Sequence, residues 1–144
     1  AYLNGANLSQ TNLSGTQLYE ADLSETNIFE ANFERSLYNE HTKFPEEFDP
    51  TEAGAYLIAP HVWLSKADLS KAQLPGVNLS GANLSGANLS QANLMWADLS
   101  GADLTGANLS GANLSEANLS DANLNGTNFS GAIMPDGTLN IDGT

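Results

Sequence analysis

The sequence contains no cysteine, so disulfides, thiolate nucleophiles and cysteine-ligated zinc sites are excluded. Basic residues are almost as scarce, because 4 Lys and Arg stand against 17 Asp and Glu, a net charge of −13 over 144 residues. Nucleic-acid phosphates and anionic lipid surfaces both require a basic patch, so neither is an expected partner. Long apolar runs are also missing, and we expect no membrane insertion. The length fits one domain.

A targeting signal is likewise missing from the sequence. The chain starts at Ala1 rather than at Met, so a leader could have been removed. A cytoplasmic location is favoured, and export to the periplasm or the thylakoid lumen is the alternative if a signal peptide was cleaved.

A five-residue repeat occupies most of the chain, and Ala-Asn-Leu-Ser-Gly at 82–86 is a clear copy. We call the Leu position the centre of each repeat. Residues 1–38 hold 7 such repeats and residues 62–131 hold 14. In the second block 13 of the 14 centres are Leu, and Ala precedes 11 of them by two positions. Internal repetition of this kind predicts a solenoid.

A period of five fits neither a helix nor a straight strand. On an α-helix five residues advance about 500°, so the leucines would form no stripe. On a strand an odd period sends successive leucines to opposite faces. All centres can point inward only if the chain turns a corner in every repeat, and Ser, Gly and Asn supply that corner chemistry.

Side-chain alternation then assigns an inside and an outside to each repeat. The centre and the residue two positions before it face inward, while Asn or Asp between them and the Ser-Gly corner face outward. The mid-stack centres expected in the core are Leu84, Leu89, Leu94, Leu99, Leu104, Leu109 and Leu114.

The repeat resembles the consensus A(D/N)LXX of the pentapeptide-repeat family, and the resemblance covers about three quarters of the chain. It implies an all-β fold, a right-handed quadrilateral β-helix with four repeats, or 20 residues, per coil. We therefore predict one solenoid domain over 1–144, with repeat blocks at 1–38 and 62–131 and a tail or cap at 132–144.

Residues 39–61 interrupt the repeat and form an insert that we expect to be a loop or a short helix. Asp49-Pro50-Thr51-Glu52 is typical of a helix start. The aromatic residues Phe44, Phe48 and Tyr56 give the insert apolar surface for docking or recognition. The stretch from Phe44 to Pro50 resembles an insertion in cyanobacterial pentapeptide-repeat proteins.

The sequence leaves two interpretations for each end of the predicted solenoid. After Gly131 the repeat decays into a Pro135-Asp136-Gly137 turn. The tail either lies over the last coil or leaves an end that pairs with a second copy, because a solenoid must close its ends. The repeat is already in phase at Ala1, so that end is a truncation point or a self-association surface.

Chemistry is hard to find in this sequence. We predict no catalytic residue, no metal ligand and no cofactor, since no triad, phosphate loop or dinucleotide motif is present. A metal site built from His41 and His61 with Glu40 or Asp49 is a weak alternative to two solvated histidines. The insert acids lack the regular spacing of a calcium loop.

The favoured function is therefore that of a non-catalytic structural or protein-interaction scaffold with an unknown partner. The alternative comes from the resemblance, because some family members are similar to duplex DNA in shape and charge and inhibit or protect DNA gyrase or topoisomerase. Duplex DNA carries about one charge per 1.7 Å. Residues 62–131 would need about ten charges to imitate it over their height, and their net charge is −3.

The insert is the best candidate for specific recognition, because loops on rigid scaffolds often carry function, and two further places are candidates. If an acidic face exists, it lies in the first block, which holds Glu20, Asp22, Glu25 and Glu30. The other place is Met95-Trp96, which replaces the usual Ser-Gly corner, so both side chains should point outward. A drifted repeat would also explain this pair, but Trp is enriched at interaction hot spots. As a contact site, the pair would receive either the insert or a second molecule.

Overall fold

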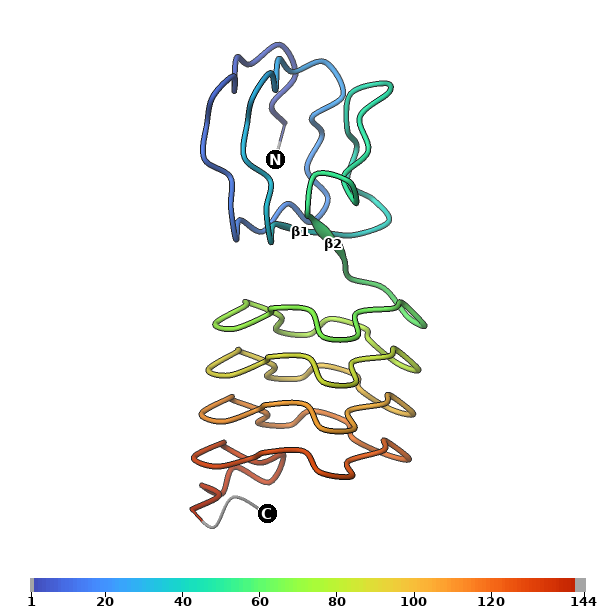
Figure 1. Cartoon of the computed structure of the whole chain (residues 1–144), viewed down its shortest axis with the longest axis vertical. Coiled ribbons are helices and arrows are strands. Elements are labelled where there is room, and N and C mark those ends of the chain that lie inside the picture. The colour runs from blue at the N-terminus through green and yellow to red at the C-terminus, as the bar shows by residue number, and fades with distance from the viewer. Residues whose placement is uncertain (1, 142–144) are drawn as a thin grey trace. The chain divides into compact units, whose positions relative to one another are not determined.

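The computed structural model describes residues 2–141, and the chain divides into two compact units, Ala1–Ile58 and Ala59–Thr144, which we describe separately. The single-domain assignment stays a prediction. Two short strands occur, β1 (Leu37–Tyr38) and β2 (Tyr56–Leu57), which pair in parallel in the first unit (Figure 1). The residues described contain no helix, so none there has the length and apolarity to cross a membrane.

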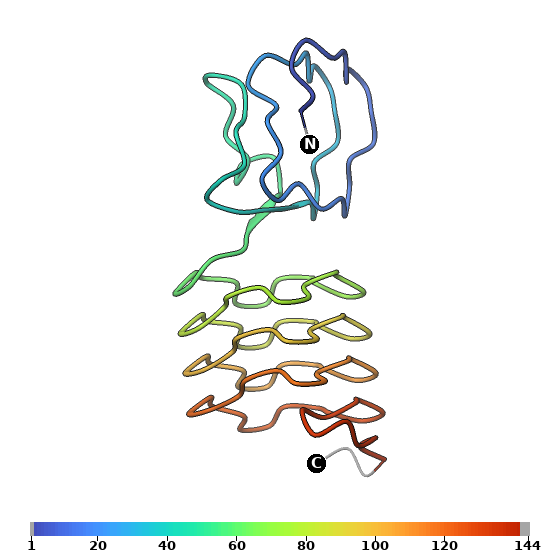
Figure 2. The ribbon, with the colours of Figure 1, turned by 180° about the vertical axis from the view of Figure 1, so that it is seen from behind.

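Successive coils lie twenty residues apart along the chain. In the second unit Trp63 bridges Asn83, Asn83 bridges Asp103, and Asp103 bridges Asn123, all in parallel. The first unit has the same spacing, as between Tyr2 and Asp22. The stacked coils of the second unit, seen from two sides, turn at each repeat (Figures 1 and 2). A four-repeat coil of twenty residues confirms the β-helix that the family resemblance implied.

Each corner is a β-turn between a centre and the Ala three residues later. Ala102 N–H donates to the Leu99 carbonyl at 3.1 Å. The third residue of the turn has a positive φ, as a type II turn requires, and Gly fills it most often because Gly has no Cβ. Gly101 has φ 65°. At the two preceding corners, Gln91 and Trp96 have φ 58° and 59°.

The outward Asn or Asp of each repeat stabilises the corner that follows it. Asn83 Oδ1 accepts the Ser85 N–H at 3.0 Å and the Ser85 hydroxyl at 2.7 Å. Asp98 does the same for Ser100, at 2.9 and 2.6 Å. These side-chain contacts are Asx turns, which mimic a backbone turn. The Asn-x-Ser spacing is therefore a structural requirement of the corner.

Leucine centres and the preceding alanines form the core of the second unit. The seven predicted centres from Leu84 to Leu114 are fully buried, each with 0% of its surface exposed. Ala82 to Ala112, at the inward position two before the centres, are exposed by no more than 1%. Alanine is small enough to let opposite walls of the coil meet, so methyl and isobutyl groups fill most of the interior, and Phe129 and Thr127 are also buried there.

The insert of residues 39–61 spans the boundary between the two units. Its first part, residues 39–58, replaces one coil of the first unit irregularly. Asp22 bridges Lys43 and Leu37 pairs with Tyr56, separations of 21 and 19 residues instead of twenty. The Thr42 hydroxyl donates to the Leu18 carbonyl at 2.7 Å and continues the stack. Residues 39–58 therefore remain hydrogen-bonded to the coil before them.

The helix that the sequence predicted at Asp49 does not form, and the insert is a loop. Asp49 Oδ1 accepts the N–H groups of Thr51 at 2.9 Å and Glu52 at 3.3 Å, as a helix N-cap does. The turn then closes, because Gly54 donates to the Thr51 carbonyl at 3.1 Å and has φ 85°. A single turn makes too few hydrogen bonds to offset the conformational entropy that helix nucleation costs.

The tail forms a short antiparallel hairpin at the last coil. Ile133 bridges Leu139, and Asn140 donates to the Ala132 carbonyl at 2.7 Å. The hairpin bends at the Pro135-Asp136-Gly137 turn that the sequence predicted, and it covers one side of the coil (Figure 2). Leu119 and Leu124, which are centres on two other sides, are only half-buried. Residues 142–144 of the predicted cap lie outside the described residues.

Candidate interaction site

The described part of the chain offers no cluster of side chains for a metal ion. Within residues 2–141 no group of three or more His, Cys, Asp or Glu side chains is placed to hold a metal ion. His41, His61, Glu40 and Asp49, the alternative metal site, are thus not gathered into such a group. All four side chains are exposed.

Trp96 lies on the outside of the second unit, at a corner of the coil. Trp96 is 57% exposed. Its backbone N–H donates to the Ser115 carbonyl of the next coil at 2.9 Å. Met95 beside it is half-buried, and its carbonyl accepts the Gly76 N–H at 2.8 Å. The backbone of this corner is therefore held from both sides, which fixes the place of the indole on a rigid wall.

Trp96 is costly for the fold in two ways. Its φ of 59° lies in the left-handed region, which disfavours residues with a Cβ by about 1–2 kcal/mol. Its indole also leaves apolar surface in water. The other non-glycine residues at this turn position in the described part of the second unit are all polar: His61, Lys66, Lys71, Gln91, Glu116 and Asp121.

Sequence reasoning missed a second exposed tryptophan. Trp63 is 83% exposed and occupies the outward position that Asn83 holds in the next coil. Side-chain alternation could have identified Trp63 from the sequence, because it directs the residue before each centre outward. In the first unit Tyr2 and Phe29 are also exposed, by 93% and 67%.

The insert aromatics are partly used by the fold itself. Phe33, a buried centre of the first unit, lies 4.9 Å from Phe48 and 6.1 Å from Phe44, measured between ring centroids. Phe44 also meets Tyr38 edge to face at 5.3 Å. Phe44, Phe48 and Tyr56 are all half-buried. Their role in recognition stays a prediction, but Phe44 and Phe48 pack against the core of their own unit.

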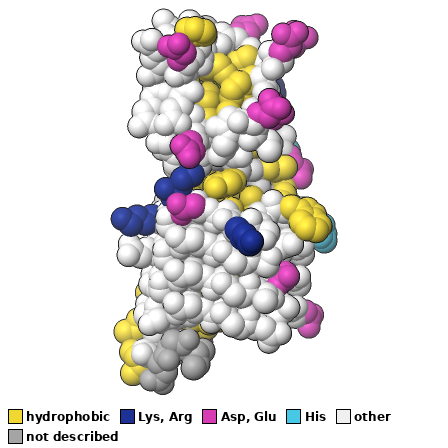
Figure 3. Space-filling view, viewed as in Figure 1, with side chains coloured by type: hydrophobic (Ala, Val, Ile, Leu, Met, Phe, Trp, Pro, Cys, Tyr) yellow, Lys and Arg dark blue, Asp and Glu magenta, His cyan; other side chains and the backbone are white. Residues whose placement is uncertain are grey.

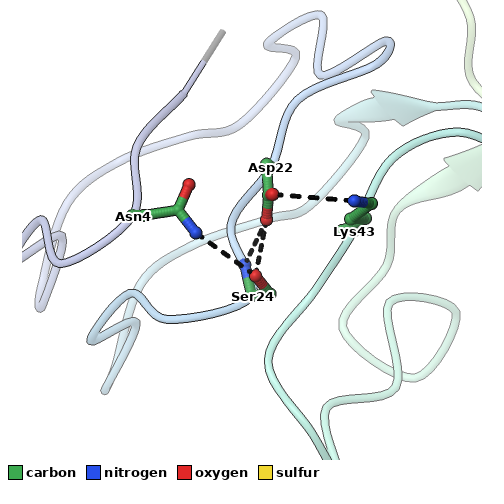
Figure 4. Close-up of polar contacts among 4 residues, drawn as sticks. All are labelled: Asn4, Asp22, Ser24 and Lys43. Carbon is green, nitrogen blue, oxygen red and sulfur yellow. Dashed lines mark hydrogen bonds and ion pairs between the residues drawn. The ribbon is translucent and has the colours of Figure 1, made fainter.

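The predicted acidic face stays a prediction; three of its carboxylates, Glu20, Glu25 and Glu30, are exposed, and Asp22 is engaged by its neighbours. Asp22 accepts the Ser24 N–H and hydroxyl at 3.0 and 2.6 Å, and Lys43 Nζ lies 3.8 Å from its other oxygen (Figure 4). The Ser24 hydrogen bonds, and then Lys43, hold the pKa of Asp22 below its usual range. Glu30 accepts a hydrogen bond from Gln10 at 3.0 Å.

The second unit presents mostly uncharged polar groups. In the space-filling view its visible face is largely free of acidic side chains (Figure 3). Asp98 lies between Asn78 and Asn118, and Asp103 between Asn83 and Asn123, so amides separate the carboxylates along each column. The hydroxyls of Ser100 and Thr105, followed by their N–H groups, lower the pKa of Asp98 and Asp103.

Comparisons with known proteins agree with this geometry. A family profile described as pentapeptide repeats matches 8 copies, over residues 1–35, 64–101 and 97–134. Among proteins with curated descriptions, none matches the chain.

Solved structures from cyanobacteria are similar to this chain. HetL of Nostoc sp. strain PCC 7120, a pentapeptide-repeat protein involved in heterocyst differentiation regulation, is 35% identical over 97% of this chain and 66% of its own, with a TM-score of 0.40. The pentapeptide-repeat protein alr5209 of Nostoc PCC 7120 is 44% identical over 50% of this chain and 64% of its own, with a TM-score of 0.36.

A third similar structure is Rfr23 of the cyanobacterium Cyanothece 51142, also a pentapeptide-repeat protein. It is 25% identical over 93% of this chain and 88% of its own, with a TM-score of 0.37. The chain thus spans about two thirds of the length of HetL and alr5209. The repeat profile covers well over half of the sequence, and the coils, corners and inward leucines are those the repeat requires. The chain belongs to the pentapeptide-repeat family.

Proposed function

We propose that this protein is a non-catalytic scaffold that binds a protein partner through the Met95-Trp96 corner. One observation carries the proposal: Trp96 combines 57% exposure with a left-handed backbone, at a position where glycine or a polar residue is the rule. The φ is shared with other corners, so the unusual feature is the exposed indole, and tryptophan is enriched at interaction hot spots.

Among residues 2–141 no His, Cys, Asp and Glu side chains gather into a possible metal site, which favours a binding role over a metal-dependent enzymatic one. Most outward side chains of the described coils are amides and hydroxyls engaged with their own corners, as in the pair Asn83 and Ser85. A general acid or base needs a perturbed environment and a partner within hydrogen-bond reach of substrate. The exposed histidines, His41 and His61, lie on the surface without such a cluster.

A protein is the partner class that fits the chemistry of the corner. A net charge of −13 disfavours nucleic acid and anionic lipid. Tryptophan offers a large, rigid contact area and is the residue type most often found at the energetic centre of protein interfaces. The Trp96 N–H is bound to Ser115 and the Met95 carbonyl accepts the Gly76 N–H, so little backbone order has to be gained on binding.

The direct test is affinity capture from an extract of the source cells with three forms of the full chain. Trp96→Gln places at this corner the residue that Gln91 already provides at the same positive φ, so the backbone requirement is unchanged. Trp63→Asn is the matched control, because Asn83 holds that position in the next coil. We expect a protein retained by the wild type and by Trp63→Asn and lost with Trp96→Gln.

Other outcomes count against the proposal. Retention by all three forms, or loss only with Trp63→Asn, would show that Trp96 is not the contact. Light scattering of the purified chain supplies a further check. If the wild type captures nothing but is a dimer that Trp96→Gln dissociates, the corner binds a second copy and the proposed partner class is wrong.

A further inference from the structure

We propose that Asn125 is a site of spontaneous deamidation. Asn125-Gly126 is one of two Asn-Gly pairs in the sequence, and the other is Asn4-Gly5. Asparagine is a chemically labile residue, and a following glycine leaves its backbone nitrogen unshielded because Gly has no Cβ. The two pairs share this local chemistry, so the surrounding structure decides which of them reacts.

The reaction needs a free backbone nitrogen on the glycine. The Gly126 nitrogen attacks Cγ of Asn125 and forms a C–N bond, its proton passes to solvent base, and the side-chain nitrogen leaves as ammonia. Water then adds to one of the two carbonyls of the resulting succinimide ring, which opens to aspartate or isoaspartate. Water is the only co-reactant, and the net change is an amide replaced by a carboxylate.

Gly126 has the nitrogen that this reaction requires. In the inner coils the corner N–H is bound to the next coil, as Gly106 N–H is bound to the Asn125 carbonyl at 2.9 Å. Gly126 lies in the last coil, and nothing among residues 2–141 accepts its N–H. Gly126 and Asn125 are both exposed, and the Asn125 carboxamide makes no hydrogen bond within the same residues.

The hydrogen bond from Gly106 also activates the reacting peptide. It is accepted by the carbonyl of the Asn125-Gly126 peptide group, and such a bond polarises the amide and makes its N–H more acidic. The nitrogen of Gly126 is thus both unhindered and easier to deprotonate.

The comparable pairs are protected. Gly5 N–H donates to the Glu25 carbonyl at 3.1 Å, and the Asn4 amide reaches the Ser24 hydroxyl at 3.5 Å. Asp136-Gly137, which could form the same ring more slowly, has its nitrogen bound to the Met134 carbonyl at 2.8 Å. Of these three pairs, Asn125-Gly126 alone combines an unbound nitrogen with an unbound side chain.

Peptide mapping by mass spectrometry after incubation of the full chain in mildly alkaline buffer tests this assignment. The fraction of aspartate plus isoaspartate is followed at Asn125 and Asn4 in the folded protein and in urea. We expect Asn125 to convert at least about five-fold faster than Asn4 in the folded protein. A five-fold difference in rate corresponds to about 1 kcal/mol, the free energy of one hydrogen bond. In urea the two rates should be similar, because the local sequences are alike.

Two results would overturn the proposal. The first is a rate at Asn125 in the folded protein that equals or falls below the rate at Asn4. The second is no conversion at Asn125 in the folded protein, whatever happens in urea. The variant Asn125→Ser, which restores the usual corner residue, identifies the signal, because it should abolish isoaspartate in this peptide and leave conversion at Asn4 unchanged.

Discussion

At the scale of single residues, each position of the five-residue repeat has one physical task. The centre fills the interior, the Ala two before it sets the wall spacing, and the Asn or Asp between them fixes the following corner. The inward positions followed from side-chain alternation alone. The Asx turn did not, because the hydrogen bonds that Asn83 accepts from Ser85 depend on a corner geometry that a periodicity argument does not contain.

Truncation of a mid-stack centre should be severe. Leu104 is fully buried, so Leu104→Ala leaves a cavity and should lower the free energy of unfolding by about 2–5 kcal/mol. Ser100→Ala removes one hydroxyl bond to Asp98 on the outside and should cost about 0.5–1.5 kcal/mol. Urea unfolding of both variants measures the difference, and similar losses would refute the inward and outward assignment.

The lowered pKa of Asp103 predicts the direction in which the free energy of unfolding changes with pH. Hydrogen bonds from Thr105 favour the ionised carboxylate in the folded state, so its folded pKa lies below its unfolded value. The stabilisation is present above the unfolded pKa of about 3.9 and is lost as the pH falls through the folded pKa.

Asp103→Asn keeps the accepting oxygen and removes this titration. Acidification below about pH 4 should therefore destabilise the wild type more than Asp103→Asn, as urea unfolding at neutral and acidic pH would reveal. Asn108→Asp, which introduces a carboxylate at an equivalent outward position next to Ser110, is the reciprocal control and should gain acid sensitivity. Identical acid dependence of wild type and Asp103→Asn would show that the hydrogen bonds do not favour the charged form.

At the scale of elements, the regular coils could be predicted from the sequence and the irregular insert could not. Columns of residues twenty apart, such as Asn78, Asp98 and Asn118, follow once the coil length is known, and the structure confirms them. That length came from the family resemblance, because a five-residue period is compatible with several corner angles. The insert has no period, so its return to the stack through Lys43 and Tyr56 was not predictable.

The aromatic cluster should hold the insert in place. Phe48 lies 4.9 Å from the buried Phe33 ring, so Phe48→Ala should lower the free energy of unfolding of the first unit by about 1–3 kcal/mol. Proteolysis between Phe44 and Tyr56 should also become faster. Phe29→Ala is the control, since this ring is 67% exposed and its loss should change little. Unchanged proteolysis in Phe48→Ala would mean that the backbone hydrogen bonds alone hold the insert.

At the scale of the whole molecule, the distribution of charge matters more than its sum. The 17 acids are divided among the repeats, the insert and the tail, and in the coils they are separated by amides. This arrangement limits like-charge repulsion, and in the described columns of the second unit it builds no continuous track of negative charge. Imitation of duplex DNA would require about one charge per 1.7 Å.

A supercoiling assay with DNA gyrase checks this argument at the same scale. We expect no inhibition by the purified chain at micromolar concentration, and no protection of the enzyme from a gyrase-directed drug. Inhibition or protection would show that the acidic residues of the first unit, including Glu20 and Glu25, suffice for recognition. Glu20→Gln with Glu25→Gln would then have to abolish the effect.

We expect Trp96 to lie in the contact with a protein partner, and the fluorescence of its indole reports on that contact. The variant Trp63→Phe leaves Trp96 as the sole tryptophan. Titration with the captured partner should shift its emission to the blue and shield it from acrylamide, because the 57% of its surface now exposed becomes buried. Trp96→Phe, which reports on Trp63 alone, should show neither change. Emission and quenching of Trp96 that stay the same at saturating partner would contradict the account.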